Sequence, residues 1–142
     1  MAYIIGVGEV GMGKLHRDPI DIAGEALRKA VDDAQLKLAD VNAMLCTRTI
    51  SGQVMFGHVL GTKEGLNPKT LIRTIDCGGA SPVVCIQQAI ELMSTGQADV
   101  AAVVGSDALL SMSSEEFFKR LPLGKQPVLS VHIMFSITHC FI

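Results

Sequence analysis

The sequence predicts an α/β fold in which strands and helices alternate within one domain. Its 142 residues are enough for a single domain and too few for two. Hydrophobic residues make up 49% of the chain and charged residues 18%, a composition that excludes an intrinsically disordered protein. Short strand-like runs alternate with segments of helical spacing in the order β-α-β-α-β-α-β. This alternation is typical of a sheet joined by right-handed helical crossovers.

The first half of the chain shows two strand–helix pairs. Asp18-Pro19 has the form of a helix start, because Asp caps free amide groups and Pro suits the first helical position. A short second helix is expected to end at Gly61 or Gly65. The predicted elements are a strand over 3–7, a helix from 19 to 34, a strand over 43–47 and a helix over 54–60.

The next segment repeats the pattern with stronger signals. Asn67-Pro68 breaks the chain before a strand expected over 71–75. Ser81-Pro82 repeats the cap-and-proline signature, and the helix after it is expected over 83–94. A continuous apolar run over 100–104 is typical of a parallel strand buried on both faces.

The character of the sequence changes after Met112, so we divide the chain into a domain over 1–112 and a tail over 113–142. Ser113 to Glu116 form a start for one more helix through Phe118. A loop with two prolines and an apolar segment over 128–142 follow. Because exposed apolar surface must be covered, this tail indicates a fragment, a foreign end or an interface with a partner.

The composition of the chain limits the classes of partner and the kinds of site that we expect. The net charge is −2, there is no Trp, and aromatic residues are only 4%, so we expect no nucleic-acid partner. No apolar stretch is long enough to span a bilayer, and we expect no secretory leader. The four cysteines, Cys46, Cys77, Cys85 and Cys140, contain no C-x-x-C pair. We therefore predict reduced thiols, no metal site and a cytoplasmic location.

A glycine pattern, Gly6-x-Gly8-x-x-Gly11, directly follows the first strand. In dinucleotide-binding proteins such glycines let the backbone approach a pyrophosphate at a helix N-terminus. Here the helix begins near Asp18, which is late for a phosphate turn, and the second strand ends without an acidic residue for a ribose. A plain glycine-rich turn is the alternative interpretation.

A second candidate is the segment from Asp76 to Pro82, which joins a strand to a helix. Free amide groups and the positive end of the helix dipole would lie at this elbow. Both features favour acyl transfer, because they lower a thiol pKa and bind a developing oxyanion. The alternative is a Gly-Gly turn that simply leads into a capped helix.

Several segments together resemble the N-terminal half of the thiolase superfamily, especially its sterol-carrier and lipid-transfer type. They read IIGVGE over 4–9, ALRKAVDDA over 26–34, GQADV over 96–100 and VVG over 103–105. The resemblance covers residues 3–112 and does not extend into the tail. It implies a layered α-β-α fold with a five-stranded mixed sheet, of which this chain holds the first half.

The resemblance also implies site residues. Members of this family carry an acyl-accepting Cys in a Cys-small-Ser-Gly motif, and counting back from Gly96 and Asp99 places that motif on Gly79, Ala80, Ser81 and Pro82. The nucleophile position is then Gly79, which has no side chain. Cys77 would serve only if the elbow differed by two residues. Gly78, Gly79, Ala80 and Ser81 are the expected substrate-binding residues, while Cys85 is expected to be a packed core residue.

The family handles acyl-CoA thioesters in lipid metabolism, so the expected ligand is coenzyme A thioester, with no other cofactor. Three functions stay open. The chain is part of an acetyl-CoA acetyltransferase-like acyltransferase, of a retro-aldolase that works with a small partner protein, or of a non-catalytic acyl-CoA-binding module or inactive fragment. The family also implies a homodimer, often formed through the strand before the elbow. This chain alone is not expected to be a competent thiolase.

The remaining titratable residues receive no catalytic role. His132, His139 and Cys140 lie in the unmatched tail, and no neighbouring carboxylate completes a metal site. His58 is expected to be packed or on the surface, and His16 to lie in the loop before the first long helix. Asp107 follows the strand over 100–104 and is expected either to cap a loop or to line the active cleft.

Overall fold

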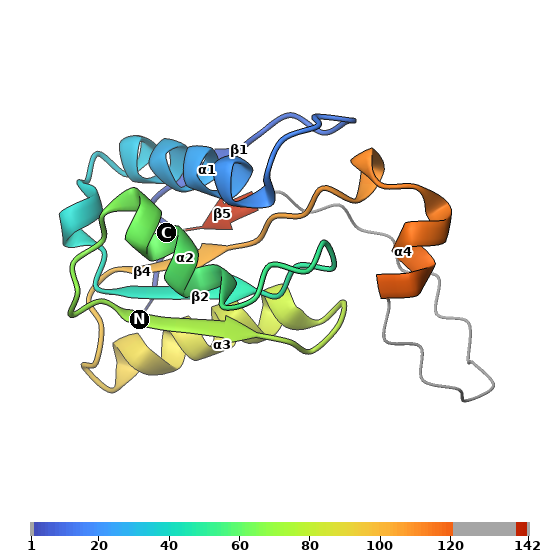
Figure 1. Ribbon diagram of the computed structural model, residues 1–142. Helices are drawn as coiled ribbons and strands as arrows, with labels where there is room; N and C mark the ends of the chain where they lie inside the picture. The colour runs from blue at the N-terminus through green and yellow to red at the C-terminus, as the bar shows by residue number, and fades with distance from the viewer. Residues whose placement is uncertain (1, 121–138, 142) are drawn as a thin grey trace.

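The computed structural model describes residues 2–120 and 139–141 and confirms an α/β fold with three layers. One face of a five-stranded sheet is covered by α1 and α2, and the other by α3 (Figure 1). The elements are β1 (Val7–Glu9), α1 (Pro19–Asp33), β2 (Ala43–Thr47), α2 (Phe56–Glu64), β3 (Leu71–Ile75), α3 (Ser81–Ser94), β4 (Ala101–Val104), α4 (Ser114–Arg120) and β5 (His139–Phe141). Short 3-10 turns at Leu38–Asp40 and Leu109–Ser111 complete them.

The sheet is mixed and has the strand order β1-β5-β4-β2-β3. β2 pairs in parallel with β3 on one side and β4 on the other. β5 lies antiparallel between β4 and β1. The fifth strand of the expected mixed sheet is therefore His139–Phe141, which lies in a segment where no strand was predicted. His132 and most of the predicted apolar segment lie outside the described residues.

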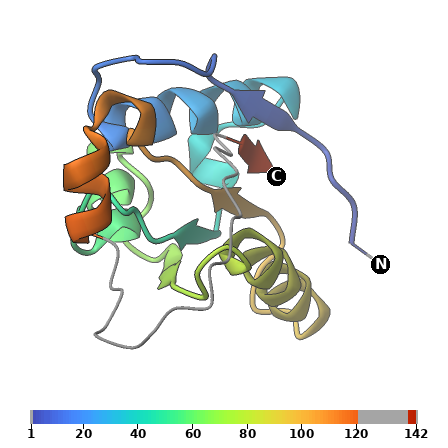
Figure 2. The same cartoon turned by 90° about the vertical axis from the view of Figure 1, so that its right-hand side faces the viewer.

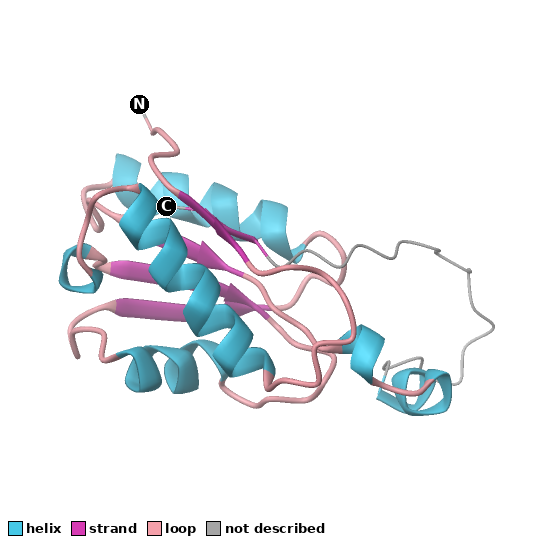
Figure 3. Ribbon diagram, turned by 90° about the horizontal axis from the view of Figure 1, so that it is seen from above, coloured by secondary structure: helices cyan, strands magenta, loops and turns pink. Residues whose placement is uncertain are grey.

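The parallel pairing brings the ends of three strands to one edge of the sheet. Ala43 at the start of β2 is opposite Leu71 and Ala101, so the three strands run in near register. Their carboxyl ends lead into loops on the same side, and α4 lies beyond them (Figure 3). Ligand sites of open α/β sheets commonly lie outside this edge.

Side chains of β2 alternate between two apolar layers. Met44 and Cys46 pack with α1, Phe56 and Leu60, whereas Ala43 and Leu45 pack with α3 through Cys85. The edge-on view shows the sheet between these two helical layers (Figure 2). Because both faces are covered, β2 is apolar at nearly every position. The four residues of β4 are all buried, as the continuous apolar run over 100–104 predicted.

Local sequence signals predicted some helix ends correctly and others not. Asp18 caps α1 as predicted, since its carboxylate accepts the Ile20 N–H at 2.8 Å. Gly65 closes α2 in the left-handed conformation, with φ of 71°, which decides between the two predicted glycines. α2 begins at Phe56 rather than at residue 54. No helix among the described residues is long and apolar enough to cross a membrane.

The first strand was predicted over 3–7, but β1 occupies Val7–Glu9. Gly6 and Gly8 are there because β1 approaches α1 closely: a Cβ on Gly8 would lie 2.1 Å from the Ala26 carbonyl oxygen. A Cβ on Gly6 would lie 2.3 Å from the Ala30 carbonyl oxygen. Strand–helix packing thus explains Gly6 and Gly8 without a phosphate turn, whereas a Cβ on Gly11 would meet no atom within 4 Å.

We predict that Gly8→Ala destabilises the fold by about 1–3 kcal/mol, because the added methyl group overpacks the β1–α1 contact. Gly11→Ala is the matched control, since a Cβ there meets no atom within 4 Å. Urea unfolding midpoints of the two variants test this. Equal midpoints would show that β1 does not dock on α1 as described.

Candidate functional site

The elbow, defined as residues 76–80, lies on the surface where β3 leads into α3. Every one of its residues is exposed, including Cys77. Gly78 adopts a left-handed φ of 58°, which a residue with a side chain adopts at a cost. The predicted junction of strand, tight turn and helix is therefore present, and its glycines face open space.

Ser81 closes this elbow from below. Its hydroxyl accepts the Cys77 N–H at 2.8 Å and donates to the Gly78 carbonyl at 2.8 Å. The side chain is buried, with 4% of its surface exposed. Ala80, and not Ser81, is the N-cap residue of α3, so the predicted role of Ser81 as a helix cap is wrong. The hydroxyl instead holds the turn together.

Most amide groups of the turn donate hydrogen bonds to acceptors within the turn itself. The Ala80 N–H donates to the Cys77 carbonyl at 3.2 Å, and the Ser81 N–H donates to the Gly78 carbonyl at 3.1 Å. The Gly78 N–H donates to the Asp76 carboxylate at 3.3 Å, and Pro82 has no N–H to offer. The elbow therefore offers fewer free donors to a ligand oxygen than its sequence suggests.

The two cysteines near the elbow differ in their surroundings. Cys77 is exposed at the turn, whereas Cys85 is fully buried in the layer beneath α3. Burial, followed by the neighbouring Cys77, raises the pKa of the Cys85 thiol to about 11. Cys85 is thus the packed residue that the sequence predicted. At Gly79, a Cβ would meet no atom within 4 Å, so this position has room for a side chain.

A cavity of about 320 Å³ lies beside the elbow, and we call it the carboxyl-end cavity. It opens between residues 48–55, here named the 48–55 loop, and the end of β3. Its lining residues are Arg48, Thr49, Gly52, Gln53, Val54, Met55, Thr74 and Asp76. Asp76 belongs to both the cavity and the elbow, so the two features form one continuous candidate site.

An ion pair joins the two sides of this cavity. The Arg48 guanidinium donates to the Asp76 carboxylate at 2.7 Å, and both side chains are about half exposed. This bond, together with the Gly78 N–H, holds the pKa of the Asp76 carboxyl below its ordinary value of 3.8. This pair was not predicted from the sequence. The available signal was that each residue directly follows one of two strands that pair in parallel.

Asp107 lies at the same edge, after β4. Its carboxylate accepts the N–H of Ser51 at 3.2 Å and of Ile50 at 2.5 Å. It also accepts the N–H of Ala108 at 2.9 Å. Of the two predicted roles, the loop cap is confirmed, because each of these bonds goes to backbone.

The remaining candidates lie away from this site. His58 is exposed on α2, and His16 lies in the loop before α1. The structure describes only the backbone of His139 and Cys140, within β5. Among the described residues, no cluster of His, Cys, Asp and Glu is arranged to hold a metal ion.

Comparison with solved structures identifies the fold. A 3-oxoacyl-[acyl-carrier-protein] synthase III from Aquifex aeolicus superposes with a TM-score of 0.66 and 13% identity, over 75% of this chain. The Ltp2-ChsH2(DUF35) aldolase gives 0.68 and 22% over 78%, and a variant of OleA from Xanthomonas campestris gives 0.59 and 18% over 64%. The chain has a partial thiolase-like fold.

These similar proteins are much longer than this chain. The match covers 44% of the Aquifex aeolicus synthase, 28% of the aldolase and 27% of OleA. No protein-family model and no curated protein matches the sequence. The likeness therefore rests on the arrangement of strands and helices.

We predict that Ser81→Ala destabilises the protein by about 1–2 kcal/mol, because it leaves the Cys77 N–H without its acceptor and removes one of the two hydrogen bonds that the Gly78 carbonyl accepts. Ser94→Ala is the control, since that hydroxyl is exposed at the other end of α3. Thermal or urea unfolding would measure both. Equal stability of the Ser81 and Ser94 variants would contradict the role of the Ser81 hydroxyl in stabilising the elbow.

We also predict that the Asp76 carboxyl titrates below its ordinary range in the folded protein. Because its folded pKa is lowered, its stabilising effect is complete above about pH 4 and is lost as the pH falls through the folded pKa. Carbon NMR of the carboxyl group would follow this titration. Arg48→Gln should raise the pKa, whereas Arg73→Gln should not, because Arg73 bonds Gln88 instead. Equal shifts in both variants would contradict the pairing.

Proposed function

We propose that this chain is the N-terminal half of a thiolase-like protein that handles acyl-CoA thioesters in lipid metabolism. The observation that carries the proposal is the elbow itself: a strand–turn–helix junction beside a cavity, on a thiolase-like sheet. Two similar structures, the synthase and the aldolase, are named as enzymes. The sterol-carrier type suggested by the sequence remains part of this proposal.

In this proposal the elbow binds the thioester without forming an acyl-enzyme. Gly79 has no nucleophilic atom, and the Ser81 hydroxyl is buried in two hydrogen bonds of the turn. Cys77 is the exposed sulfur of the elbow and is the alternative nucleophile. Gly78, Gly79 and Ala80 line the approach to the thioester carbonyl, while Ser81 keeps them in place.

A second candidate reaction is retro-aldol cleavage of a carbon–carbon bond in an acyl-CoA, assisted by a small partner protein. One observation favours it: the Ltp2-ChsH2(DUF35) aldolase is among the similar structures. Such chemistry requires no acyl-accepting cysteine, which agrees with a glycine at position 79. A non-catalytic acyl-CoA-binding module would use the same elbow and cavity without turnover.

We further propose a cytoplasmic homodimer. β3 is the last strand of the sheet order, so its outer edge has no strand partner among the described residues. Arg73 and Thr74 on this strand are exposed. An edge strand can pair with the same strand of a second copy. This dimer would place the two elbows on either side of the shared edge.

Binding is tested with the full chain by calorimetry with coenzyme A and acetyl-CoA. Saturable binding without covalent change supports an acyl-CoA site that lacks a nucleophile. An acetyl adduct that peptide mapping places on Cys77 would show that the elbow differs by two residues and that acyl transfer proceeds. The absence of any binding would overturn the proposed ligand.

We predict that Gly79→Cys gains a covalent acetyl group from acetyl-CoA. The introduced thiolate would attack the thioester carbonyl, form a new sulfur–acyl bond and release coenzyme A as its thiolate. The site has room for this side chain. Intact mass and peptide mapping measure the adduct, and Gly11→Cys is a control in open space outside the elbow. Equal labelling of the two variants would contradict Gly79 as the nucleophile position.

A further inference from the structure

We propose that Asp107 is a positioning residue for the carboxyl-end cavity. It lies after β4, whereas the cavity lies at the ends of β2 and β3. The inference concerns the order of the 48–55 loop, and it rests on the proposed function only where ligand binding is measured. Asp107 is not a lining residue of the cavity, and its hydrogen bonds go to Ile50, Ser51 and Ala108. It acts through the backbone that carries the lining residues.

The carboxylate joins two segments that are far apart in the sequence. Asp107 follows β4, whereas its partners Ile50 and Ser51 lie 57 and 56 residues earlier, after β2. Asp107 is partly buried, so water competes less for these bonds. Hydrogen bonds to an ionised acceptor are roughly twice as strong as those between neutral groups. One side chain thus fastens the loop after β2 to the end of β4.

Most of the cavity wall depends on that loop. Six of its eight lining residues, Arg48, Thr49, Gly52, Gln53, Val54 and Met55, belong to it. The Thr49 hydroxyl accepts the Gln53 N–H at 3.1 Å, but this bond lies within the loop and does not anchor it. The buried hydroxyls of Ser51 and Ser106 have no hydrogen-bond partner among the described residues. The neighbouring serine side chains therefore do not share the anchoring role of Asp107.

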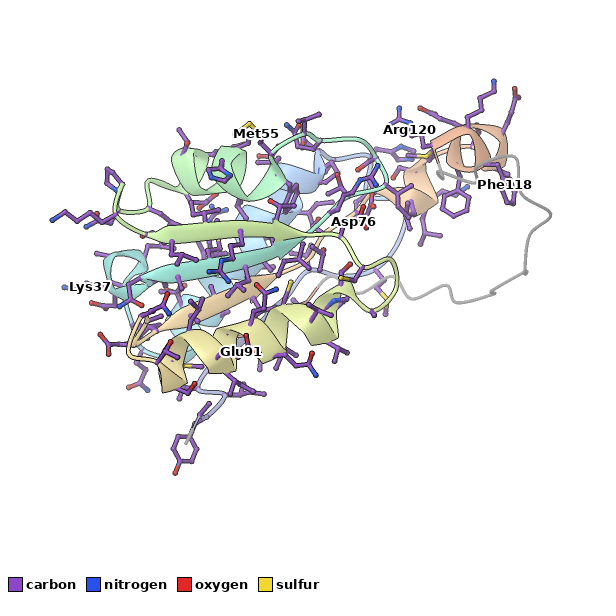
Figure 4. All side chains as sticks on the ribbon, turned by 90° about the horizontal axis from the view of Figure 1, so that it is seen from below. Lys37, Met55, Asp76, Glu91, Phe118 and Arg120 are labelled. Carbon is purple, nitrogen blue, oxygen red and sulfur yellow. The ribbon has the colours of Figure 1, made fainter. Side chains whose placement is uncertain are left out.

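Besides the backbone bond from the Arg48 N–H to the Ile75 carbonyl at 3.0 Å, two side-chain contacts connect the loop to its surroundings. Arg120 of α4 donates to the Ser51 carbonyl, next to the amide that Asp107 holds. At the start of the loop, Arg48 bonds Asp76, which in turn accepts the Gly78 N–H of the elbow. Asp76 and Arg120 lie at the same end of the molecule (Figure 4). Asp107 is thus linked to the elbow through its bonds to the loop backbone, the covalent chain back to Arg48, and the hydrogen bonds of Asp76.

The proposal is tested with Asp107→Asn and Asp107→Glu in the full chain. The asparagine keeps the size of the side chain but loses the charge and turns a donor group toward the two loop amides. The glutamate keeps the carboxylate and should restore part of the effect. Asp99→Asn is the matched control, because Asp99 is an exposed carboxylate before β4 whose bond to Asn42 spans 3.4 Å.

Hydrogen exchange at the amides of Ile50 and Ser51 is the first measurement. We expect exchange at least about tenfold faster in Asp107→Asn than in Asp99→Asn, the scale set by losing a hydrogen bond to a charged group. We also expect the alkylation rate of exposed Cys77 to change, because the elbow is linked to the loop. Unchanged exchange at both amides, or an unchanged Cys77 rate, would overturn the proposal.

Coenzyme A binding is the second measurement. It separates the role of Asp107 from the proposed function of the chain. If the unaltered chain binds coenzyme A, Asp107→Asn should weaken binding several-fold, and its effect should not add to that of Arg48→Gln. Additive effects would overturn the role of Asp107 in shaping the site. If the unaltered chain binds none, the proposed function fails, and hydrogen exchange with Cys77 alkylation still decides the role of Asp107.

Discussion

Parallel pairing of β2 with both β3 and β4 is the constraint on which the rest of this structure depends. It makes β2 a central strand, apolar toward both helical layers, and it brings three strand ends to one edge of the sheet. Each strand end delivers one polar residue to that edge: Arg48, Asp76 and Asp107. The carboxyl-end cavity and the elbow both follow from this convergence.

Two kinds of interaction at this edge have different roles: an exposed ion pair and hydrogen bonds from side chains to the backbone. Arg48 and Asp76 form a half-exposed pair, which contributes little to stability but links the cavity to the elbow. Asp107 and Ser81 instead form partly buried hydrogen bonds with the backbone, where an unpaired group is costly. The residues that keep the site in shape are therefore different from those that face a ligand.

Predictions from local signals were confirmed where one residue determines the outcome. Asp18 caps α1, Gly65 closes α2 and Cys85 is buried, because each depends on the chemistry of its own side chain. One local prediction failed, and features that require two segments to meet were not predicted. Ser81 looked like a helix cap, but its hydroxyl bonds the turn before the helix. The close packing of β1 against α1, which leaves no room for a Cβ on Gly6 or Gly8, was not predicted from the glycine pattern.

The sequence by itself determined the α/β class, the order of the elements as far as β4 and the position of the elbow, because periodicity, capping residues and glycines act over a few neighbours. Tertiary structure alone decided the position of β5 in the sheet, the meeting of Arg48 with Asp76, and the use of the elbow amides within the turn. Each of these depends on which groups meet in the folded chain, and a local sequence pattern does not contain that information. Asp107 shows this most clearly, since its role is visible only when β4 lies beside β2.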